Sequence, residues 1–326
     1  MATYKDIHGF KIQNVSSDPP ASFTGQVWYN STSGALKADT GPLVAATWST
    51  QNSLNTARLG LAGAGTVGAS LAIGGQTEPP TVFRAETESY NGTSWTEVAD
   101  LNKARSKLAS SAYSPVSSTI VFAGDTNSPT PARLDNSETW NGSVWTNAPT
   151  INTARAEVAG AGNSATNALL FGGETPGGFS SATEIWNGSS WATTTAMPRT
   201  QAFGAGAGAS STAALSFLAY STGYTYSWNG SNWTEVNAMN TTRYSGGGSG
   251  TNTSAVAIGG LGSGATETWN GTNWSVADAL NTSRYKMGAG GVGNASSLAF
   301  GGFAPGISSA TEEFSQSGGI KTIETS

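Results

Sequence analysis

An all-β fold, a β-propeller of six four-stranded blades, is predicted by three features of this 326-residue sequence. Near-copies of one segment recur along the chain, and a Trp at one fixed position returns every 41 to 50 residues, a period typical of propeller blades. Each copy contains short runs of small, β-branched and aromatic residues, separated by Gly and by Asn-Gly. Gly and β-branched residues interrupt every window in which a helical pattern could form, so the sequence disfavours a helical repeat.

The composition agrees with short strands and tight turns, because 43 Gly accompany 11 Trp, 9 Tyr and 11 Phe. Only 11% of residues are charged and the net charge is -5, so we expect no nucleic-acid partner, which would require clustered Lys and Arg. Without Cys, disulfides, thiolate metal sites and a Cys nucleophile are excluded. We find neither a signal peptide nor a run of 18 apolar residues, and therefore expect no membrane insertion.

Residues 1–42 lie outside the repeat and are predicted to form an attachment segment. The segment begins with mixed apolar and charged residues such as Tyr4, Lys5 and Phe10, and it contains the hairpin-like VWYNSTSGALK over 27–37. It is too short to fold alone, so we expect the propeller or another protein to order it. If residues 27–37 belonged to another blade, the propeller would have seven blades.

Each copy of the repeat is expected to contain four strands. Strand one has small residues, as in LGLAGAG, which suit the crowded position beside a propeller axis. Strand two is apolar and ends in glycines, and strand three carries an acid and an aromatic residue, as in TETW. Asn-Gly then marks a hairpin turn, because both residues tolerate positive φ. Strand four begins at the Trp of the fixed position, which is Trp48, Trp95, Trp145, Trp191, Trp233 or Trp274.

The two ends of the repeat region are expected to complete one blade together. The last copy ends in ATEEFSQSGGIKTIETS and has no Trp for a fourth strand, whereas ATWST supplies a fourth strand before the first copy begins. We therefore predict that the strand at Trp48 pairs with the strand around Phe314, which removes two open sheet edges. The propeller would then span residues 43–316, followed by a C-terminal tail over 317–326.

An Arg at the start of strand one and a Glu early in strand three occur together in five of the six copies. Both positions lie at the same end of an antiparallel blade, with the glycines of strand two between them, so the Arg can cross strand two and bind the Glu. A ring of arginines that grips an anion is disfavoured, because one Arg per blade does not converge. The predicted pairs are Arg58–Glu88, Arg105–Glu138, Arg155–Glu184, Arg243–Glu267 and Arg284–Glu312. The fourth copy breaks the rule with Gln201, Tyr226 and, in place of Gly-Gly, Leu218-Ala219.

This pattern resembles the kelch repeat, in which Gly-Gly ends strand two and an aromatic residue and a Trp follow, as in Gly74-Gly75, Tyr90 and Trp95. The Asn-Gly-rich copies and the preceding GQVWYNSTSGALK are also similar to kelch-like structural proteins of tailed bacteriophages. That resemblance implies a non-enzymatic protein of the virion surface, a tail fibre, spike or capsid decoration, made in the host cytoplasm. It further implies an oligomer on the particle, bound to other virion proteins through residues 1–42, with host-surface glycans or a receptor as further partners.

An enzymatic site is not expected. The copper site of galactose oxidase, which shares kelch repeats, needs two His and a Tyr-Cys crosslink, whereas this chain has only His8 and no Cys. A Ser-His-Asp triad would have to use His8, which lies in the attachment segment. The recurring Glu of strand three appears once per blade, so it is not expected to form the carboxylate pairs, about 5 to 9.5 Å apart, of glycosidases. We therefore predict no catalytic residue, no cofactor and no metal site.

The connections between strands two and three differ from copy to copy, and loops on a rigid scaffold commonly carry recognition. Their aromatic and basic residues are the candidate binding residues: Phe83, Arg84, Arg133, Phe179, Tyr220, Tyr224 and Phe303. Because exposed aromatic rings stack on sugars, a free carbohydrate-binding propeller lectin is the alternative function. The aromatic residues at fixed repeat positions are expected in the core. The simpler interpretation of the variable loops is that they are tolerated surface insertions.

Overall fold

The computed structural model describes residues 12–17, 27–39, 46–126, 132–220, 223–316 and 320–322. The chain divides into two compact units, one of Met1–Ala46 with Gln316–Ser326 and the other of Thr47–Ser315. The regular elements of the described residues are all β-strands, and this part of the chain has no helix with the length and apolar character to cross a membrane. Much of the predicted attachment segment, including His8, lies outside the described residues.

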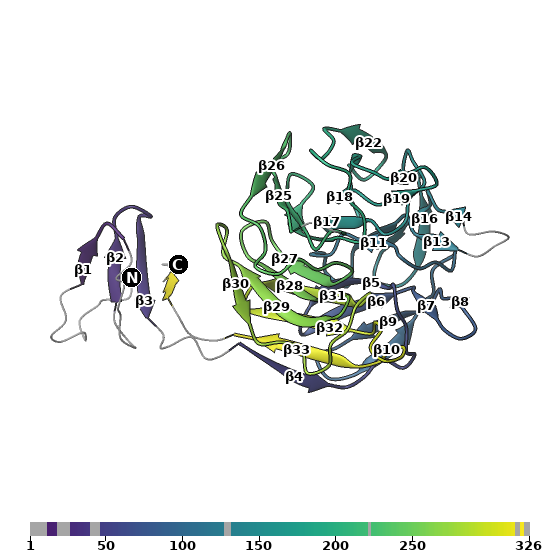
Figure 1. Cartoon of the computed structure of the whole chain (residues 1–326), viewed down its shortest axis with the longest axis horizontal. Helices are drawn as coiled ribbons and strands as arrows, with labels where there is room; N and C mark the ends of the chain where they lie inside the picture. Colours follow the sequence, from purple (N-terminus) through teal and green to yellow (C-terminus); the bar gives the residue numbers. More distant parts are fainter. Residues whose placement is uncertain are drawn as a thin grey trace. The chain divides into compact units, whose positions relative to one another are not determined.

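The larger unit contains, in its described residues, six four-stranded antiparallel sheets (Figure 1). The first strands are β5 (Ala62–Thr66), β11 (Ala109–Ser110), β17 (Ala159–Ser164), β23 (Ala205–Ser210), β27 (Gly247–Gly250) and β31 (Gly288–Gly293). The second strands are β6 (Ala69–Ile73), β12 (Thr119–Phe122), β18 (Asn167–Phe171), β24 (Ala213–Phe217), β28 (Ala255–Gly260) and β32 (Ser296–Phe300). The third strands are β9 (Thr87–Tyr90), β15 (Ser137–Trp140), β21 (Thr183–Trp186), β25 (Thr225–Trp228), β29 (Ser263–Trp269) and β33 (Thr311–Ser315). The fourth strands are β10 (Trp95–Val98), β16 (Trp145–Ala148), β22 (Trp191–Thr194), β26 (Trp233–Val236), β30 (Trp274–Ala277) and β4 (Thr47–Gln51).

The sheets form a propeller-like arrangement in which each first strand contacts the first strands of the neighbouring sheets, from β5 through β31 and back to β5. The first strands lie toward the middle of this unit and the fourth strands toward its outside (Figure 1). Crowding at the middle explains the small residues of strand one. A Cβ atom added to Gly63, for example, would lie only 2.2 Å from the carbonyl oxygen of Ala289 in a neighbouring sheet.

The last sheet takes its fourth strand from the beginning of the repeat region, as predicted. β4 pairs antiparallel with β33, and Trp48 lies opposite Phe314. The two rings pack with their centroids 5.3 Å apart. This pairing covers the outer edge that the last copy of the repeat would otherwise leave open.

A buried hydrogen bond joins each sheet to the preceding one. The indole Nε1 of the fourth-strand Trp donates, over 2.9 to 3.1 Å, to the hydroxyl that precedes the Glu position in the third strand of the preceding sheet. The pairs are Trp48–Thr266, Trp95–Thr311, Trp145–Thr87, Trp191–Ser137, Trp233–Thr183 and Trp274–Thr225. Each sheet is therefore bonded to both of its neighbours through the core.

The Asn-Gly segments form four-residue hairpin loops. Asn91 Oδ1, for example, accepts hydrogen bonds from the backbone N–H groups of Thr93 and Ser94, both over 2.9 Å. Gly92 follows with φ of 88°, a left-handed conformation that favours glycine. The Asn side chain thus takes the place of a backbone acceptor and fixes the loop, which aligns Tyr90 with Trp95.

Three two-stranded ribbons lie between the second and third strands of the first three sheets. They are β7 (Gln76–Thr77) with β8 (Val82–Phe83), β13 (Asp125–Thr126) with β14 (Ala132–Arg133), and β19 (Glu174–Thr175) with β20 (Gly178–Phe179). The variable connections of these sheets are therefore partly ordered by backbone pairing.

The smaller unit is a separate sheet in the order β1 (Gln13–Val15), β2 (Val27–Asn30), β3 (Ala35–Asp39) and β34 (Ile320–Thr322). Trp28 is fully buried. Residues 27–37, which the seven-bladed alternative would have placed in the propeller, form β2 and most of β3 here. Residues 317–326 were expected to be a tail, but they contribute β34, because the edge of β3 offers antiparallel partners to it.

We expect Thr87→Val to lower the free energy of unfolding by about 1 to 3 kcal/mol, because the indole N–H of Trp145 would stay buried without an acceptor. Urea unfolding of the full chain measures the change. The matched control is Thr96→Val on the exposed side of β10, which should change stability by less than about 0.5 kcal/mol. Equal urea midpoints of unfolding for the two variants would show that the hydrogen bond between sheets contributes nothing to stability.

Candidate functional site

All five predicted Arg–Glu ion pairs are present in the structure, and their side chains are at most 3% exposed. Arg58 Nη2 lies 2.8 Å from Glu88 Oε1, and Arg284 Nη2 lies 2.8 Å from Glu312 Oε1. Burial lowers the pKa of the Arg58 guanidinium, and the charge of Glu88 opposes that change. Arginine does not lose its proton in proteins, so the pairs stay ionic.

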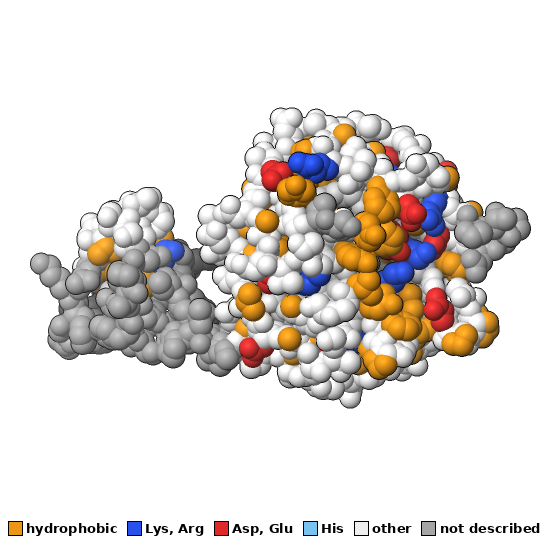
Figure 2. Space-filling model, viewed as in Figure 1, with side chains coloured by type: hydrophobic (Ala, Val, Ile, Leu, Met, Phe, Trp, Pro, Cys, Tyr) orange, Lys and Arg blue, Asp and Glu red, His pale blue; other side chains and the backbone are white. Residues whose placement is uncertain are grey.

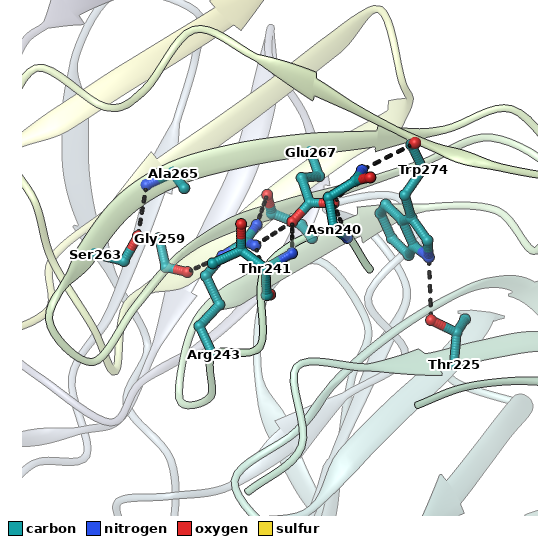
Figure 3. Close-up of polar contacts among 10 residues, drawn as sticks. Thr225, Asn240, Thr241, Arg243, Gly259, Ser263, Ala265, Glu267 and Trp274 are labelled. Atoms are coloured by element: carbon teal, nitrogen blue, oxygen red, sulfur yellow. Dashed lines mark hydrogen bonds and ion pairs between the residues drawn. The ribbon is translucent and has the colours of Figure 1, made fainter. Parts of the chain in front are cut away.

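The second carboxylate oxygen of each Glu binds the connection that enters the sheet. In the fifth sheet, Glu267 Oε2 accepts from the backbone N–H of Asn240 over 2.7 Å, and Asn240 Nδ2 donates to the carbonyl oxygen of Trp274 over 3.0 Å (Figure 3). Arg243 binds Glu267 and also donates to the carbonyl oxygen of Gly259 over 2.9 Å. One buried carboxylate therefore fixes the start of strand one.

The glycines that end strand two allow close approach of the next connection. Gly74 has φ of 61°, and a Cβ atom there would lie 2.8 Å from the carbonyl oxygen of Arg105. The carbonyl oxygen of Gly74 accepts from Arg58 Nη1 over 2.8 Å. The glycine pair therefore has three roles. It lets the backbone turn with positive φ, it lets the next connection pack closely, and it leaves room for the Arg side chain.

A closed cycle of backbone hydrogen bonds links six residues, one from each sheet. Each of them lies two positions after the Arg or Gln that starts its sheet. Each N–H donates to the carbonyl oxygen of the equivalent residue in the preceding sheet, over 2.7 to 3.1 Å. All six have φ between 51° and 65°, which turns the chain into strand one. These ring residues are Gly60, Lys107, Glu157, Phe203, Ser245 and Lys286.

The ring residues line a cavity of about 80 Å³ at the mouth of a channel. A second cavity of about 90 Å³ continues along the first strands and is lined mainly by Gly and Ala. Because the ring uses its backbone N–H and C=O groups internally, a molecule at the mouth meets mainly the side chains of the ring residues.

Three ring residues belong to a charged cluster. Lys286 Nζ lies 3.6 Å and Lys107 Nζ 4.0 Å from Glu157 Oε1, and Lys107 Nζ lies 2.8 Å from Asp125 Oδ2. Arg133 joins Asp125 to Glu174 across 3.2 Å and 2.8 Å. Burial raises the pKa of Glu157, and the two lysines oppose that rise.

An aromatic cluster lies beside the charged one and includes the ring residue Phe203. Its four rings, Phe179, Phe203, Tyr220 and Tyr244, have neighbouring centroids 4.8 to 6.3 Å apart. Phe179 is 39% and Tyr220 43% exposed. Hydrophobic side chains form a band on the larger unit, with acidic and basic side chains beside it (Figure 2). The ring residues and the two clusters together are called the mouth face below.

Of the predicted binding residues, the structure brings Arg133, Phe179 and Tyr220 to the mouth face. Arg133 and Phe179 lie on the ribbons β13–β14 and β19–β20. Backbone pairing of Phe179 with Glu174 places the aromatic cluster directly beside the charged cluster.

The other predicted residues lie apart from these contacts. Tyr224 packs against the buried core of the fourth sheet. Phe303 contacts Tyr285 with ring centroids 5.4 Å apart. Phe83 is half-buried in β8, and Arg84 forms an ion pair with an acid two residues further along the chain.

Sequence reasoning missed the other residues of the mouth face, among them Lys107, Glu157, Phe203, Tyr244 and Lys286. A signal for them exists in the sequence. The two positions after each Arg or Gln hold a different pair of residues in every copy. The Arg before them and the strand-one residues after them repeat. Variation at a fixed position inside a repeat therefore marks the mouth face.

The fourth sheet replaces the ion pair with neutral groups. Gln201 Oε1 accepts from Ser216 Oγ over 2.9 Å, but Gln201 Nε2 and the Tyr226 hydroxyl find no hydrogen-bond partner among the described residues. Burial also raises the pKa of Tyr226. The sheet that supplies Phe203 and Tyr220 to the aromatic cluster is thus the one without a buried ion pair.

No protein-family model matches this sequence, and the curated proteins contain no match to it. Among solved structures, the structure of YjhT matches 83% of this chain and 99% of its own chain. The TM-score is 0.63 and the sequence identity is 12%. At this identity the similarity supports the propeller-like fold alone.

We expect Glu184→Ala to lower the free energy of unfolding by about 3 to 5 kcal/mol, because Arg155 would be left as an unpaired buried charge. Thermal and urea unfolding measure this loss. The control, Glu235→Ala, removes an exposed Glu and should change stability by less than about 0.5 kcal/mol. A similarly small loss in both variants would contradict a structural role for the pair.

We expect Glu157→Gln to stabilise the protein at pH 7 by about 0.5 to 2 kcal/mol. The folded state raises the pKa of Glu157, so the contribution of this group to stability is complete below its unfolded pKa and is lost as the pH rises through the folded pKa. Gln does not ionise and avoids that loss. Urea unfolding at about pH 4 and pH 7 should show the gain at pH 7 only, and Glu97→Gln, an exposed control, should show none.

Proposed function

We propose that this chain is a non-enzymatic structural protein of a bacteriophage particle, a tail fibre, spike or capsid-surface decoration. In this proposal a six-bladed kelch-like β-propeller carries the mouth face as a recognition surface for a host-surface molecule or another protein. The smaller unit attaches the propeller to other virion proteins. The protein is made in the host cytoplasm and is present in several copies on the virion surface.

The observation that carries the proposal is the mouth face itself. The pair of residues after the Arg or Gln differs in every copy, whereas the residues that position this pair repeat. Phe179 and Tyr220 stay exposed although they are large and apolar, and a cluster of such rings on a rigid scaffold is typical of a binding surface.

The six-bladed interpretation is supported by the cyclic contacts of the larger unit. The six Trp–hydroxyl bonds and the six bonds among the ring residues each return to their starting sheet. The pairing of β4 with β33 supplies the strand that the last kelch-like copy lacks.

The virion part of the proposal is supported by the resemblance of the repeat to kelch-like phage proteins. The division of the chain agrees with it, because the small unit contains segments from both ends of the chain and is separate in structure from the larger one. Such a unit can attach to a particle without using the mouth face.

A free carbohydrate-binding lectin is the second candidate, and the exposed aromatic cluster favours it. The charges of the mouth face are consistent with a ligand of low net charge, since three basic groups accompany three acidic ones. These groups are Lys107, Arg133 and Lys286 with Asp125, Glu157 and Glu174.

Peptide mass spectrometry of purified particles separates the two candidates. The virion proposal requires the chain to be enriched with the known coat proteins through successive density gradients. Recovery in the free lysate alone would favour the lectin.

Binding of the full chain to host cells tests the mouth face. We expect Tyr220→Ala to weaken binding about tenfold or more, because an exposed aromatic anchor is removed. The control is Val276→Ala on β30, which removes a side chain that is 71% exposed and outside the mouth face. Equal weakening in both variants, or in neither, would contradict a recognition role for this face.

A further inference from the structure

Glu157 has an unused acceptor at the channel mouth. Its side chain is only 9% exposed, and its Oε1 atom accepts no hydrogen bond among the described residues. The ammonium groups of Lys286 and Lys107 lie 3.6 and 4.0 Å from this oxygen, beyond the usual 2.7 to 3.2 Å of an N–H···O bond. The three side chains therefore face one another without direct hydrogen bonds.

The cavity beside Glu157 has room for part of a ligand. Its volume of about 80 Å³ exceeds the roughly 10 to 15 Å³ that one water requires. All six ring residues line it, including Glu157, both lysines and Phe203. A ligand that enters the mouth thus meets a carboxylate, two ammonium groups and an aromatic ring.

A hydroxyl is the ligand group that satisfies these side chains together. It accepts a hydrogen bond from a lysine and at the same time donates one to the carboxylate. A carboxylate or phosphate group could reach Lys286 only by lying beside the like charge of Glu157. Lys107 is already paired with Asp125 over 2.8 Å. An ammonium group would be repelled by the lysines. An apolar group would leave the buried acceptor unsatisfied.

We propose that the channel mouth is a binding subsite for a neutral pyranose sugar. One sugar hydroxyl lies between Lys286 and Glu157, and the apolar face of the sugar ring packs against Phe203 and the neighbouring aromatic cluster. This inference rests on the proposed recognition role of the mouth face and names the ligand class for it.

The test is binding of methyl glucoside, galactoside, mannoside and N-acetylglucosaminide to the full chain, by saturation-transfer NMR and titration calorimetry. We expect at least one neutral pyranoside to bind, and Glu157→Gln and Lys286→Met each to weaken it about tenfold or more. Glu97→Gln, an exposed control on β10, should bind as the wild type does. Because Glu157→Gln is expected to fold at least as stably as the wild type at pH 7, its loss of binding is not a loss of fold.

Deoxy analogues of the bound sugar identify the hydroxyl. Removing the hydroxyl that lies between Lys286 and Glu157 should weaken binding to the wild type more than binding to Glu157→Gln. Removing any other hydroxyl should weaken both proteins equally.

Three results would overturn the inference: no binding of any pyranoside by the wild type, equal binding by the wild type and both mouth variants, or stronger binding of a methyl glucuronide than of the neutral sugars. None of them decides the proposed function, which depends on the presence of the chain in particles and on the effect of Tyr220→Ala on cell binding.

Discussion

The buried carboxylate in the third strand determines where strand one of each of five sheets begins. It binds the Arg that starts the sheet and a backbone N–H of the incoming connection, so the chain enters strand one at one defined place. The second residue after the Arg then turns with positive φ and bonds to its equivalents from the neighbouring sheets. The ring, the channel mouth and the mouth face all follow from this anchoring.

The fourth sheet shows how this constraint can be relaxed. Gln201 and Tyr226 occupy the positions of the ion pair, yet Phe203 keeps its place in the ring through hydrogen bonds to Glu157 and Ser245. The neighbouring sheets therefore position this copy. A local departure from a repeated rule often accompanies a functional surface, and here the same copy supplies Phe203 and Tyr220 to the aromatic cluster.

The Trp–hydroxyl bonds and the ion pairs stabilise the larger unit in different directions. Each indole bond joins neighbouring sheets through their cores, whereas each ion pair joins a connection to its own sheet. Together they leave the ribbons and the residues after the Arg free to vary in sequence. A scaffold of this kind can change its ligand through a few side chains without changing its fold.

Comparison of the repeat copies is enough to predict the features that recur in register. The Arg–Glu pairs, the Asn-Gly loops and the pairing of Trp48 with Phe314 each depend on residues at fixed positions of one repeat, so comparison of the copies predicts them. Which of the variable residues meet depends on the folded arrangement of the sheets. Glu157 and Lys286 are far apart in the chain and converge because strands from different sheets come together at one axis, whereas Tyr224, close to Tyr220 in sequence, packs into the core instead. The strand β34 likewise depends on an edge of β3 that is remote in sequence.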